Sequence, residues 1–268
     1  MSKFAIVNDL DRKEESRLYE EFPPDEYKYL KVADLINMSW QPFFDDRRLI
    51  GVVKSNDSIA LLEAHGIATL GYESTDELLT SFYVTEDLSV VEPSDLEIVY
   101  SRFHNIPLEI LQTDRCKLRE HTLEDYSAIA KIYDDESMTK YIEPLFEPKE
   151  EKEYLKNYID TIYKLFGYGL WLIIDKASGE VIGRAGVETR ESCIEDKQVE
   201  LSYQVKKAFQ NKGIATEVCL SIIDYTFNTI GKDSVIARVD EDNEASIKVI
   251  NKLGFEPYKD GVYIKRKQ

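Results

Sequence analysis

One short segment of the chain combines residue types that can bind phosphate. A strand that ends near residue 205 is followed by the loop Gln210-Asn211-Lys212-Gly213 and by a helix that begins Ile214-Ala215-Thr216. The first amides of a helix have no partner inside it and point out of its end, where the helix dipole favours negative charge. Small residues in the loop and first turn let a phosphodiester approach the backbone, and Lys212 can add a charge-assisted contact. This helix start is therefore predicted to bind a diphosphate.

The elements that position this loop follow from the spacing of apolar residues. After residue 115 we expect a strand at 116–119, a helix opened by the capping box Thr122 to Asp125, and a second helix after Pro148. A β-meander is expected at 170–174, 181–188 and 199–205, a long helix at 214–230, a buried strand at 234–239, a helix at 243–253 ended by Gly254, and closing strands at 255–258 and 262–265.

This order of elements, with the motifs it carries, resembles the GNAT acetyltransferases. Residues 210–215 fit the pyrophosphate loop of that family, Gln/Arg-x-x-Gly-x-Gly/Ala. The later family signature is matched by Asn243-Glu244-Ala245-Ser246 and Leu253-Gly254-Phe255, and the strands at 182–186 and 200–205 resemble the ribosomal-protein N-terminal acetyltransferase branch. The resemblance covers about residues 115–266. It implies an α/β (α+β) fold with a mixed, mostly antiparallel, splayed sheet flanked by helices.

The resemblance also implies where acetyl-CoA would bind. The backbone of Tyr203, Gln204 and Val205 would pair with the pantetheine arm, in a cleft where this strand splays from residues 235–237. The amides that would hold the pyrophosphate are those of Gln210, Asn211, Lys212, Gly213, Ile214, Ala215 and Thr216. Asn243 would lie beside the pantetheine or the thioester sulfur, and Ser246 would contact the cofactor. The alternatives are a helix N-cap for Asn243 and an ordinary first-turn position for Ser246.

Direct attack of an amine on the thioester asks for few catalytic groups. The side chain of lysine has a pKa near 10.4 and an α-amine has a pKa near 8, so a general base helps a lysine acceptor more than an α-amine acceptor. Glu200 is the predicted base, acting directly or through water, and a solvated or ion-paired carboxylate is the alternative reading. A backbone N–H near Val205 is the expected oxyanion donor. Family members commonly place a tyrosine acid seven residues after the asparagine, and Ile250 at that position excludes one here.

Residues 1–110 show no such match and read as a small α/β domain. Strands at 49–53 and 67–72 flank a helix capped by Asn56 or Asp57, which favours a parallel pair. Further strands are expected at 4–7 and 81–84 and a helix from Pro93, whereas residues 14–46 give no clear pattern. Asp9-Leu10-Asp11 after an apolar strand resembles the haloacid-dehalogenase phosphatases, although Arg12-Lys13 replaces the usual Gly-Thr. A degenerate, non-catalytic relative is the alternative to an active phosphatase.

The composition narrows the range of partners. A formal net charge of −17 argues against nucleic acid and anionic membrane surfaces, and it is compatible with a cationic or amine acceptor. The longest apolar runs are too short to span a bilayer. Three widely spaced cysteines (Cys116, Cys193 and Cys219) and three scattered histidines form neither a disulfide framework nor a metal site. We therefore expect a cytoplasmic protein without a bound metal.

Together these patterns predict two domains, residues 1–110 and residues 111–268. The second is expected to transfer acetyl from acetyl-CoA to a primary amine, which is a protein N-terminus, a lysine or a small amine. Two alternatives stay open: a CoA-binding regulatory protein without turnover, and a bifunctional protein with a hydrolase-like first domain. A homodimer is also open. The tyrosine-rich second helix of this domain, with Tyr154, Tyr158 and Tyr163, either packs in the core or lines the acceptor cleft.

Overall fold

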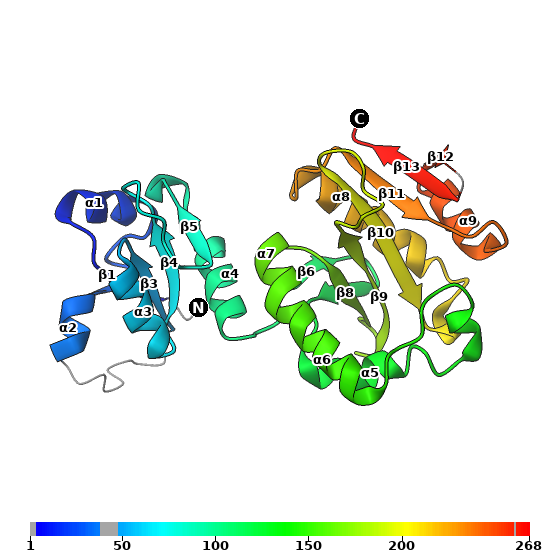
Figure 1. The fold of residues 1–268 in the computed structure, drawn as a ribbon, viewed down its shortest axis with the longest axis horizontal. Coiled ribbons are helices and arrows are strands. Elements are labelled where there is room, and N and C mark those ends of the chain that lie inside the picture. The colour runs from blue at the N-terminus through cyan, green and yellow to red at the C-terminus, as the bar shows by residue number, and fades with distance from the viewer. Residues whose placement is uncertain (1–3, 38–47, 260) are drawn as a thin grey trace. The chain divides into compact units, whose positions relative to one another are not determined.

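The chain folds into two compact units, Met1–Ile106 and Pro107–Gln268, each built on its own sheet (Figure 1). This computed structural model describes residues 4–37, 48–259 and 261–268. Among those residues, no helix has the length and apolar character needed to cross a lipid bilayer.

The first unit is a parallel sheet with the strand order β2-β1-β3-β4-β5. Its strands are β1 (Ala5–Asn8), β2 (Lys28–Lys31), β3 (Leu49–Val53), β4 (Ala68–Tyr72) and β5 (Tyr83–Thr85). Its α-helices are α1 (Arg12–Glu21), α2 (Val32–Asn37), α3 (Asn56–Ala64) and α4 (Pro93–Phe103), and a 3-10 turn, η1, covers Leu88–Val90. The apolar strands are buried between the helices, as their sequence predicts.

The expected parallel pair, β3 with β4, is confirmed, and so are the strands near residues 4–7 and 81–84 and the helix from Pro93. The predicted cap of α3 is wrong. Ser55 caps this helix, because its hydroxyl accepts a hydrogen bond from the Ser58 amide at 3.2 Å. Within the unassigned stretch 14–46, the structure has most of α1 together with β2 and α2, while residues 38–47 lie outside the described part of the chain.

The second unit is an eight-stranded sheet with the order β12-β13-β11-β10-β9-β8-β7-β6. All neighbouring pairs are antiparallel except β10 with β11, so the sheet is mixed and mostly antiparallel, as expected. The strands are β6 (Glu109–Gln112), β7 (Cys116–Arg119), β8 (Leu170–Asp175), β9 (Val181–Glu188), β10 (Gln198–Val205), β11 (Ser234–Arg238), β12 (Glu256–Lys259) and β13 (Val262–Arg266).

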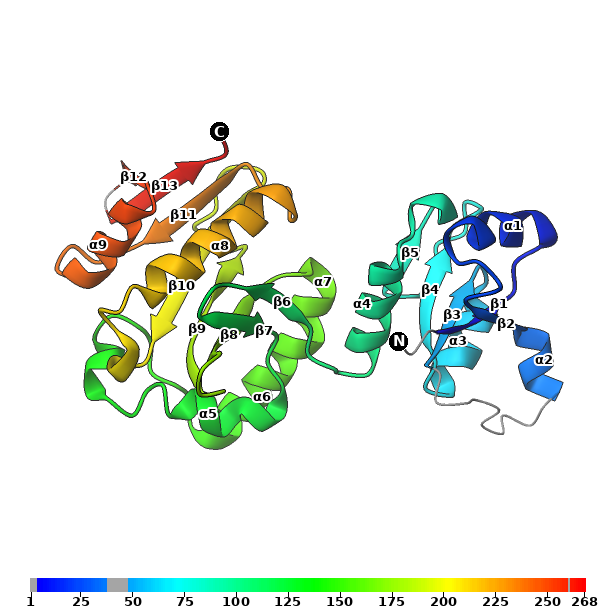
Figure 2. The same cartoon turned by 180° about the vertical axis from the view of Figure 1, so that it is seen from behind.

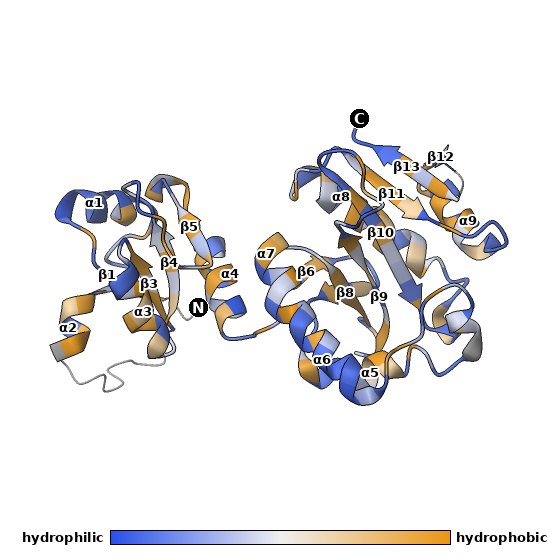
Figure 3. Cartoon of the chain, viewed as in Figure 1, coloured by the Kyte–Doolittle hydropathy of each residue, from blue (hydrophilic) through white to orange (hydrophobic). Residues whose placement is uncertain are grey.

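Helices cover both faces of this sheet. The helical elements are η2 (Leu123–Asp125), α5 (Tyr126–Ala130), η3 (Glu136–Lys140), α6 (Pro148–Tyr158), a π-turn η4 (Ile159–Tyr163), α7 (Lys164–Phe166), η5 (Lys207–Phe209), α8 (Ile214–Asn228) and α9 (Glu244–Lys252). Figure 1 shows α5, α6 and α7 over one face, and Figure 2 shows α8 over the other. The longer helices α6 and α8 bury apolar residues against the sheet. Figure 3 contrasts the apolar strands β8 and β11 with the more polar α6.

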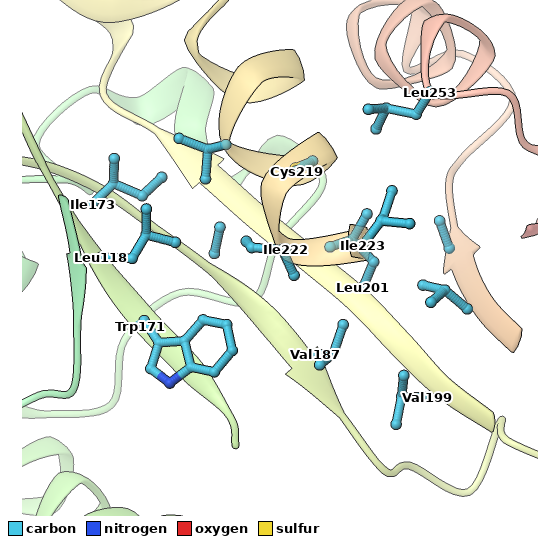
Figure 4. Packing of buried hydrophobic residues seen from close by; sticks show 14 of the residues in the cluster. Leu118, Trp171, Ile173, Val187, Val199, Leu201, Cys219, Ile222, Ile223 and Leu253 are labelled. Atoms are coloured by element: carbon cyan, nitrogen blue, oxygen red, sulfur yellow. The ribbon is translucent and has the colours of Figure 1, made fainter. Parts of the chain in front are cut away.

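The α8 face of the sheet holds the main core. Alternate residues of β8 to β10, including Trp171, Val187 and Leu201, pack against Cys219 and Ile222 of α8 (Figure 4). Because side chains alternate along a strand, the residues between them point to the α5–α7 face. On that face β9 and β10 carry Arg184, Glu188, Glu200 and Gln204, which are polar although Arg184 and Glu200 are buried and the other two are partly buried.

A buried ion pair fixes the start of the α5 segment. Arg119 makes two hydrogen bonds of 2.7 Å to the carboxylate of Asp125, which also accepts from the Thr122 amide and so completes the predicted capping box. Burial alone would raise the pKa of Asp125, but the hydrogen bonds from Arg119 and Thr122 outweigh it and the pKa is lowered.

We expect the substitution Asp125→Asn to cost about 3 kcal/mol in the free energy of unfolding at neutral pH, because it breaks a largely buried pair. The lowered pKa of Asp125 means that this stabilisation is complete above the unfolded value near 3.9 and is lost as the pH falls through the folded value. Urea unfolding at pH 7 and pH 3 should therefore show a difference from wild type that shrinks in acid. A difference as large at pH 3 as at pH 7 would contradict this account.

Candidate active site

The sheet of the second unit opens along β10. The parallel ladder between β10 and β11 joins only Gln198–Glu200 to Ser234–Ile236, whereas β10 stays paired with β9 as far as Val205. Residues 201–205 therefore have an edge with no strand partner in the described structure. The splay predicted between this strand and residues 235–237 is present, and the two strands part after the pair Glu200–Ile236. Tyr203, Gln204 and Val205 lie on the part of β10 whose edge is free.

The loop after β10 leads into α8 through two left-handed residues. Asn211 has φ 58° and Gly213 has φ 78°, and Gly213 is the N-cap of α8. No side chain caps the helix, so the amides of its first turn keep their donors for a ligand. Ile214 is buried in the core, and Ala215 and Thr216 follow it in the first turn. The sequence placed this helix at 214–230; it ends two residues earlier, at Asn228.

Two side chains hold the loop in place. Gln210 donates from Nε2 to the Val205 carbonyl at 2.9 Å, and its own amide donates to Lys207, so this residue ties the loop to the end of β10. Arg115 donates from Nη1 to the Lys212 carbonyl at 2.7 Å and from Nε to Glu217 at 2.6 Å. Lys212 itself extends its ammonium over the Phe209 ring. Contacts with the end of β10, with the residue before β7 and with the first turn of α8 thus hold the loop in one conformation.

We expect Arg115→Lys to weaken acetyl-CoA binding about fivefold. The single ammonium group of a lysine cannot bind the Lys212 carbonyl and the Glu217 carboxylate at once, as the planar guanidinium does. A partly exposed charged contact of this kind contributes roughly 1 kcal/mol. Isothermal titration with acetyl-CoA measures this change. Arg266→Lys is the matched control, since Arg266 forms an exposed pair with Glu195 on another part of this unit. Equal affinities for the two variants would contradict a role of Arg115 in the loop.

Asn243 and Ser246 lie at the start of α9. The side chain of Asn243 accepts from the Ser246 amide at 3.1 Å, so Asn243 is the N-cap, which was its alternative reading. The Ser246 carbonyl lies 3.5 Å from the Tyr203 hydroxyl, which links β10 to α9 on the α8 face. Burial raises the pKa of Tyr203, and this hydroxyl therefore stays protonated at neutral pH. Ile250 is fully buried in the core.

Glu200 is buried, with 7% of its surface exposed, and its Oε2 is hydrogen-bonded to the Ser192 hydroxyl. It is therefore not the solvated surface carboxylate of the alternative reading. Directly opposite it on β9 lies Glu188, whose carboxylate is held by Tyr158 and Arg190. Sequence reasoning did not single out Glu188 or Arg190. A signal for Glu188 was available, because Arg184 and Glu188 are charged residues in an otherwise apolar strand. They are four positions apart, so the alternation of a strand places them on the same face.

The acidic motif of the first unit has structural partners. Asp9 accepts from the Lys54 amide at 2.8 Å and from the Ser55 hydroxyl at 2.9 Å, one partner for each carboxylate oxygen. Asp11 is the N-cap of α1 and forms a capping box with Glu14. These contacts link the end of β1 to the residues that follow β3 and to the start of α1.

The chemistry of the β10–α8 site fits acetyl-CoA. A Cβ placed on Gly213 would meet only the Arg115 Nη2 atom, at 3.6 Å, so the outer side of the turn is open to a diphosphate. The free strand edge beyond Glu200 offers backbone donors and acceptors to an extended amide chain such as pantetheine. In the described part of the chain, no three His, Cys, Asp or Glu side chains gather in a way that could hold a metal ion.

Comparison with known proteins agrees with this geometry. Residues 115–256 match the acetyltransferase (GNAT) domain family. The uncharacterized N-acetyltransferase p20 of Bacillus licheniformis is 30% identical over 152 residues, which cover 56% of this chain and 83% of p20. The uncharacterized N-acetyltransferase YoaA of Bacillus subtilis is 31% identical, over 57% of this chain and 85% of YoaA.

The crystal structure of an acetyltransferase from Agrobacterium tumefaciens has the same fold, with a TM-score of 0.50 at 20% identity, over 60% of this chain and 95% of that one. The family match covers more than half of the chain and contains the splayed strand, the loop and the helix start described above. The chain therefore belongs to the GNAT acetyltransferase family and is an acyltransferase.

Proposed function

We propose that the second unit transfers an acetyl group from acetyl-CoA to a primary amine by direct attack. The observation that carries this proposal is the splay of β10 from β11 beside an uncapped α8 N-terminus. The backbone of Tyr203 to Val205 would pair with the pantetheine arm, and the amides from Asn211 to Thr216 would hold the pyrophosphate. Gln210 would serve the site by fixing the loop. Asn243 and Ser246 would border the cofactor from the start of α9.

Glu200 is the proposed base, and it would act through water. Glu200 and Val205 are five residues apart on one strand, which is roughly 16 Å along the backbone. A base at one end and an oxyanion donor near the other cannot both touch the reacting atoms directly, so an ordered water would carry the proton to Glu200. The Lys206 amide donates to the Ile182 carbonyl of β9, so the alternate amides of Tyr203 and Val205 face the free edge. The Tyr203 N–H is the nearer of the two to Glu200 and could also meet the thioester oxygen.

The acceptor would approach from the α5–α7 face, where Glu200 and Glu188 lie under the tyrosines of α6. A negative site suits an amine that arrives protonated, and the net charge of −17 attracts cations at long range. Peptides with a free N-terminus, free lysine and small amines are all candidates on this chemistry.

The test combines binding and turnover. Thermal unfolding with and without acetyl-CoA measures binding, because a ligand of the folded state raises the melting temperature. Release of the free thiol in the presence of peptide, lysine and small-amine acceptors measures transfer. We expect protection by acetyl-CoA and acetylation of at least one acceptor class. No protection would overturn the proposed cofactor site, and protection without any turnover would favour a CoA-binding regulatory protein.

A further inference from the structure

Two carboxylates face each other across the strands of the acceptor side. Glu188 of β9 and Glu200 of β10 are directly opposite in the antiparallel register, so both side chains point to the α5–α7 face. Opposite residues of such a pair have Cβ atoms about 4.5–5.5 Å apart, and like charges there destabilise each other. Glu200 is 7% exposed and the Glu188 side chain is 12% exposed. Water screens this repulsion only weakly, so the pair needs compensation.

Glu188 is compensated completely. Its Oε1 accepts from the Tyr158 hydroxyl at 2.8 Å, and its Oε2 accepts from Nε and Nη2 of Arg190 at 3.2 and 2.5 Å. Each oxygen therefore has a fixed donor, and the guanidinium supplies one positive charge. Glu188 cannot leave this position without giving up an ion pair and a buried hydrogen bond.

The position of Tyr158 depends on the π-turn that follows α6. This turn inserts one residue, so Tyr158 and Tyr163 both face the sheet with their ring centroids 5.3 Å apart. The Tyr158 hydroxyl accepts from the Leu170 amide at 2.7 Å, and the Tyr163 hydroxyl donates to the Leu170 carbonyl. A Cβ at Gly169 would lie 2.6 Å from the Tyr158 oxygen, so glycine is required there. The tyrosine that holds Glu188 is thus itself held by the start of β8.

Glu200 is compensated only in part. Its Oε2 contacts the Ser192 hydroxyl, and within the described residues no lysine, arginine or histidine nitrogen lies within 4.0 Å of it. Arg190, already paired with Glu188, is the cation whose charge reaches it. Arg184, the other arginine on this face, is hydrogen-bonded to the Tyr133 hydroxyl and makes no ion pair within 4.0 Å with either carboxylate in the described structure. The two carboxylates therefore share one directly paired guanidinium, and an ammonium group would supply a second positive charge.

We propose that Glu188 is a positioning residue for Glu200, and that the two carboxylates with Arg190 form the subsite that receives the acceptor's ammonium group. This inference rests on the proposed function, because it assigns that reaction its acceptor subsite. Arg190 cancels the charge of Glu188, and Glu200 keeps the uncompensated negative charge. Tyr158 and Arg190 fix Glu188 directly opposite Glu200, so Glu188 defines the position from which Glu200 faces the acceptor.

The proton balance of the reaction follows from this arrangement. The bound ammonium gives one proton to Glu200 through water, and the neutral amine attacks the carbonyl carbon of the thioester. The new C–N bond forms as the C–S bond breaks, and the nitrogen loses its second proton. One of the two protons ends on the departing thiolate and the other is released to solvent. Glu200 is then ionised again for the next acceptor.

Three tyrosines and two arginines surround the carboxylate pair. The groups that face it are Tyr154 and Tyr158 of α6, Tyr163 of the π-turn, Arg184 of β9 and Arg190 after β9. Burial raises the pKa values of the three tyrosines, and the two arginines stay cationic.

The experiment compares Glu188→Gln with Arg190→Gln in the full chain. The probes are acetyl-CoA and the best acceptor from the amine panel, and the readouts are the acetyl-CoA Kd and the pH profile of kcat/KM. Glu188→Gln removes the negative charge opposite Glu200. The acidic limb of the kcat/KM profile should therefore move to lower pH by about one unit, and the KM for the acceptor should rise roughly tenfold. Arg190→Gln removes the compensating charge, so the limb should move to higher pH. Glu195→Gln, in the same β9–β10 loop, should move neither quantity.

If the pH profiles of the two variants shift in opposite directions and the acetyl-CoA Kd is unchanged, the proposed subsite is supported, because a loss of packing would not produce shifts of opposite sign. If the acidic limbs of both variants coincide with that of wild type, the proposed subsite is overturned. If either variant fails to fold, Tyr158→Phe keeps both charges and removes the hydroxyl that bonds Glu188 and the Leu170 amide. We then expect a higher KM for the acceptor, and an unchanged KM overturns the positioning role. Failure of wild type to bind acetyl-CoA instead overturns the proposed function, so the two failures are distinguishable.

Discussion

Replacing Glu200 by Gln should lower kcat about 10²-fold or more at pH 7 while leaving the Kd for acetyl-CoA within about twofold of wild type. Glutamine has nearly the same shape and can keep the contact with Ser192, but it cannot accept a proton. At pH 7 roughly one in 2,500 lysine side chains is neutral, against about one in ten α-amines, so the loss should be larger with a lysine-type acceptor. The residual activity should rise with pH as the free amine becomes more abundant.

The measurement is single-turnover acetyl transfer from pH 6 to pH 9.5, with acetyl-CoA binding followed by calorimetry. Glu195→Gln is the control, because Glu195 pairs with Arg266 and Tyr258 and lies away from the reacting pair. Unchanged turnover in Glu200→Gln would show that the base is another group. If wild-type protein binds acetyl-CoA but acetylates no amine, the regulatory reading of this chain gains support instead.

The elements that position the site are predictable because their signals are local. The amphipathic repeat of residues 214–228 and the glycine at its start predict a helix with an open N-terminus, and the structure has both. The meander strands lie within one residue of their predicted bounds, since apolar runs between polar turns leave few alternatives. The resemblance to the GNAT family adds what the local signals lack. It identifies the strand that precedes the loop as the one that splays from its neighbour.

The composition of the acceptor side could not be read in the same way. Glu188 and Glu200 meet because β9 and β10 have one particular register, and the long connection of residues 189–197 does not define that register. Arg190 and Ser192 come from this same connection and reach the pair only in the folded chain. The π-turn is equally hidden, because an α-helical spacing would place Tyr158 and Tyr163 on different faces.

The first unit shows where local signals compete. Asn56 and Asp57 are as good N-cap residues as Ser55 on propensity, and the choice is made by tertiary contacts: the Ser55 hydroxyl also binds the Asp9 carboxylate at 2.9 Å. The same contact gives Asp9 of the Asp9-Leu10-Asp11 motif a structural role at the end of β1. Both aspartates connect β1 to its neighbours.

Replacing Gly213 by Ala should raise the Kd for acetyl-CoA at least tenfold, and Gly213→Val should raise it further. Gly213 has φ 78°, a left-handed conformation that costs a residue with a Cβ roughly 1–2 kcal/mol. The strain can be relieved if the turn changes conformation, and the first amides of α8 then no longer point at the ligand. If the turn keeps its conformation, the added Cβ occupies the side on which the diphosphate would bind. Only the Arg115 guanidinium lies near the added carbon, at 3.6 Å, so the added group would face the diphosphate rather than the core.

Gly179 provides a matched control for this strain. It has φ 71° in the turn between β8 and β9, and a Cβ there would meet no atom within 4 Å. Gly179→Ala and Gly213→Ala should therefore lose similar amounts of stability in urea unfolding, while only Gly213→Ala loses acetyl-CoA affinity. If both variants bind acetyl-CoA as tightly as wild type, the α8 N-terminus does not hold the diphosphate. The catalytic arrangement built on it would then need another cofactor site.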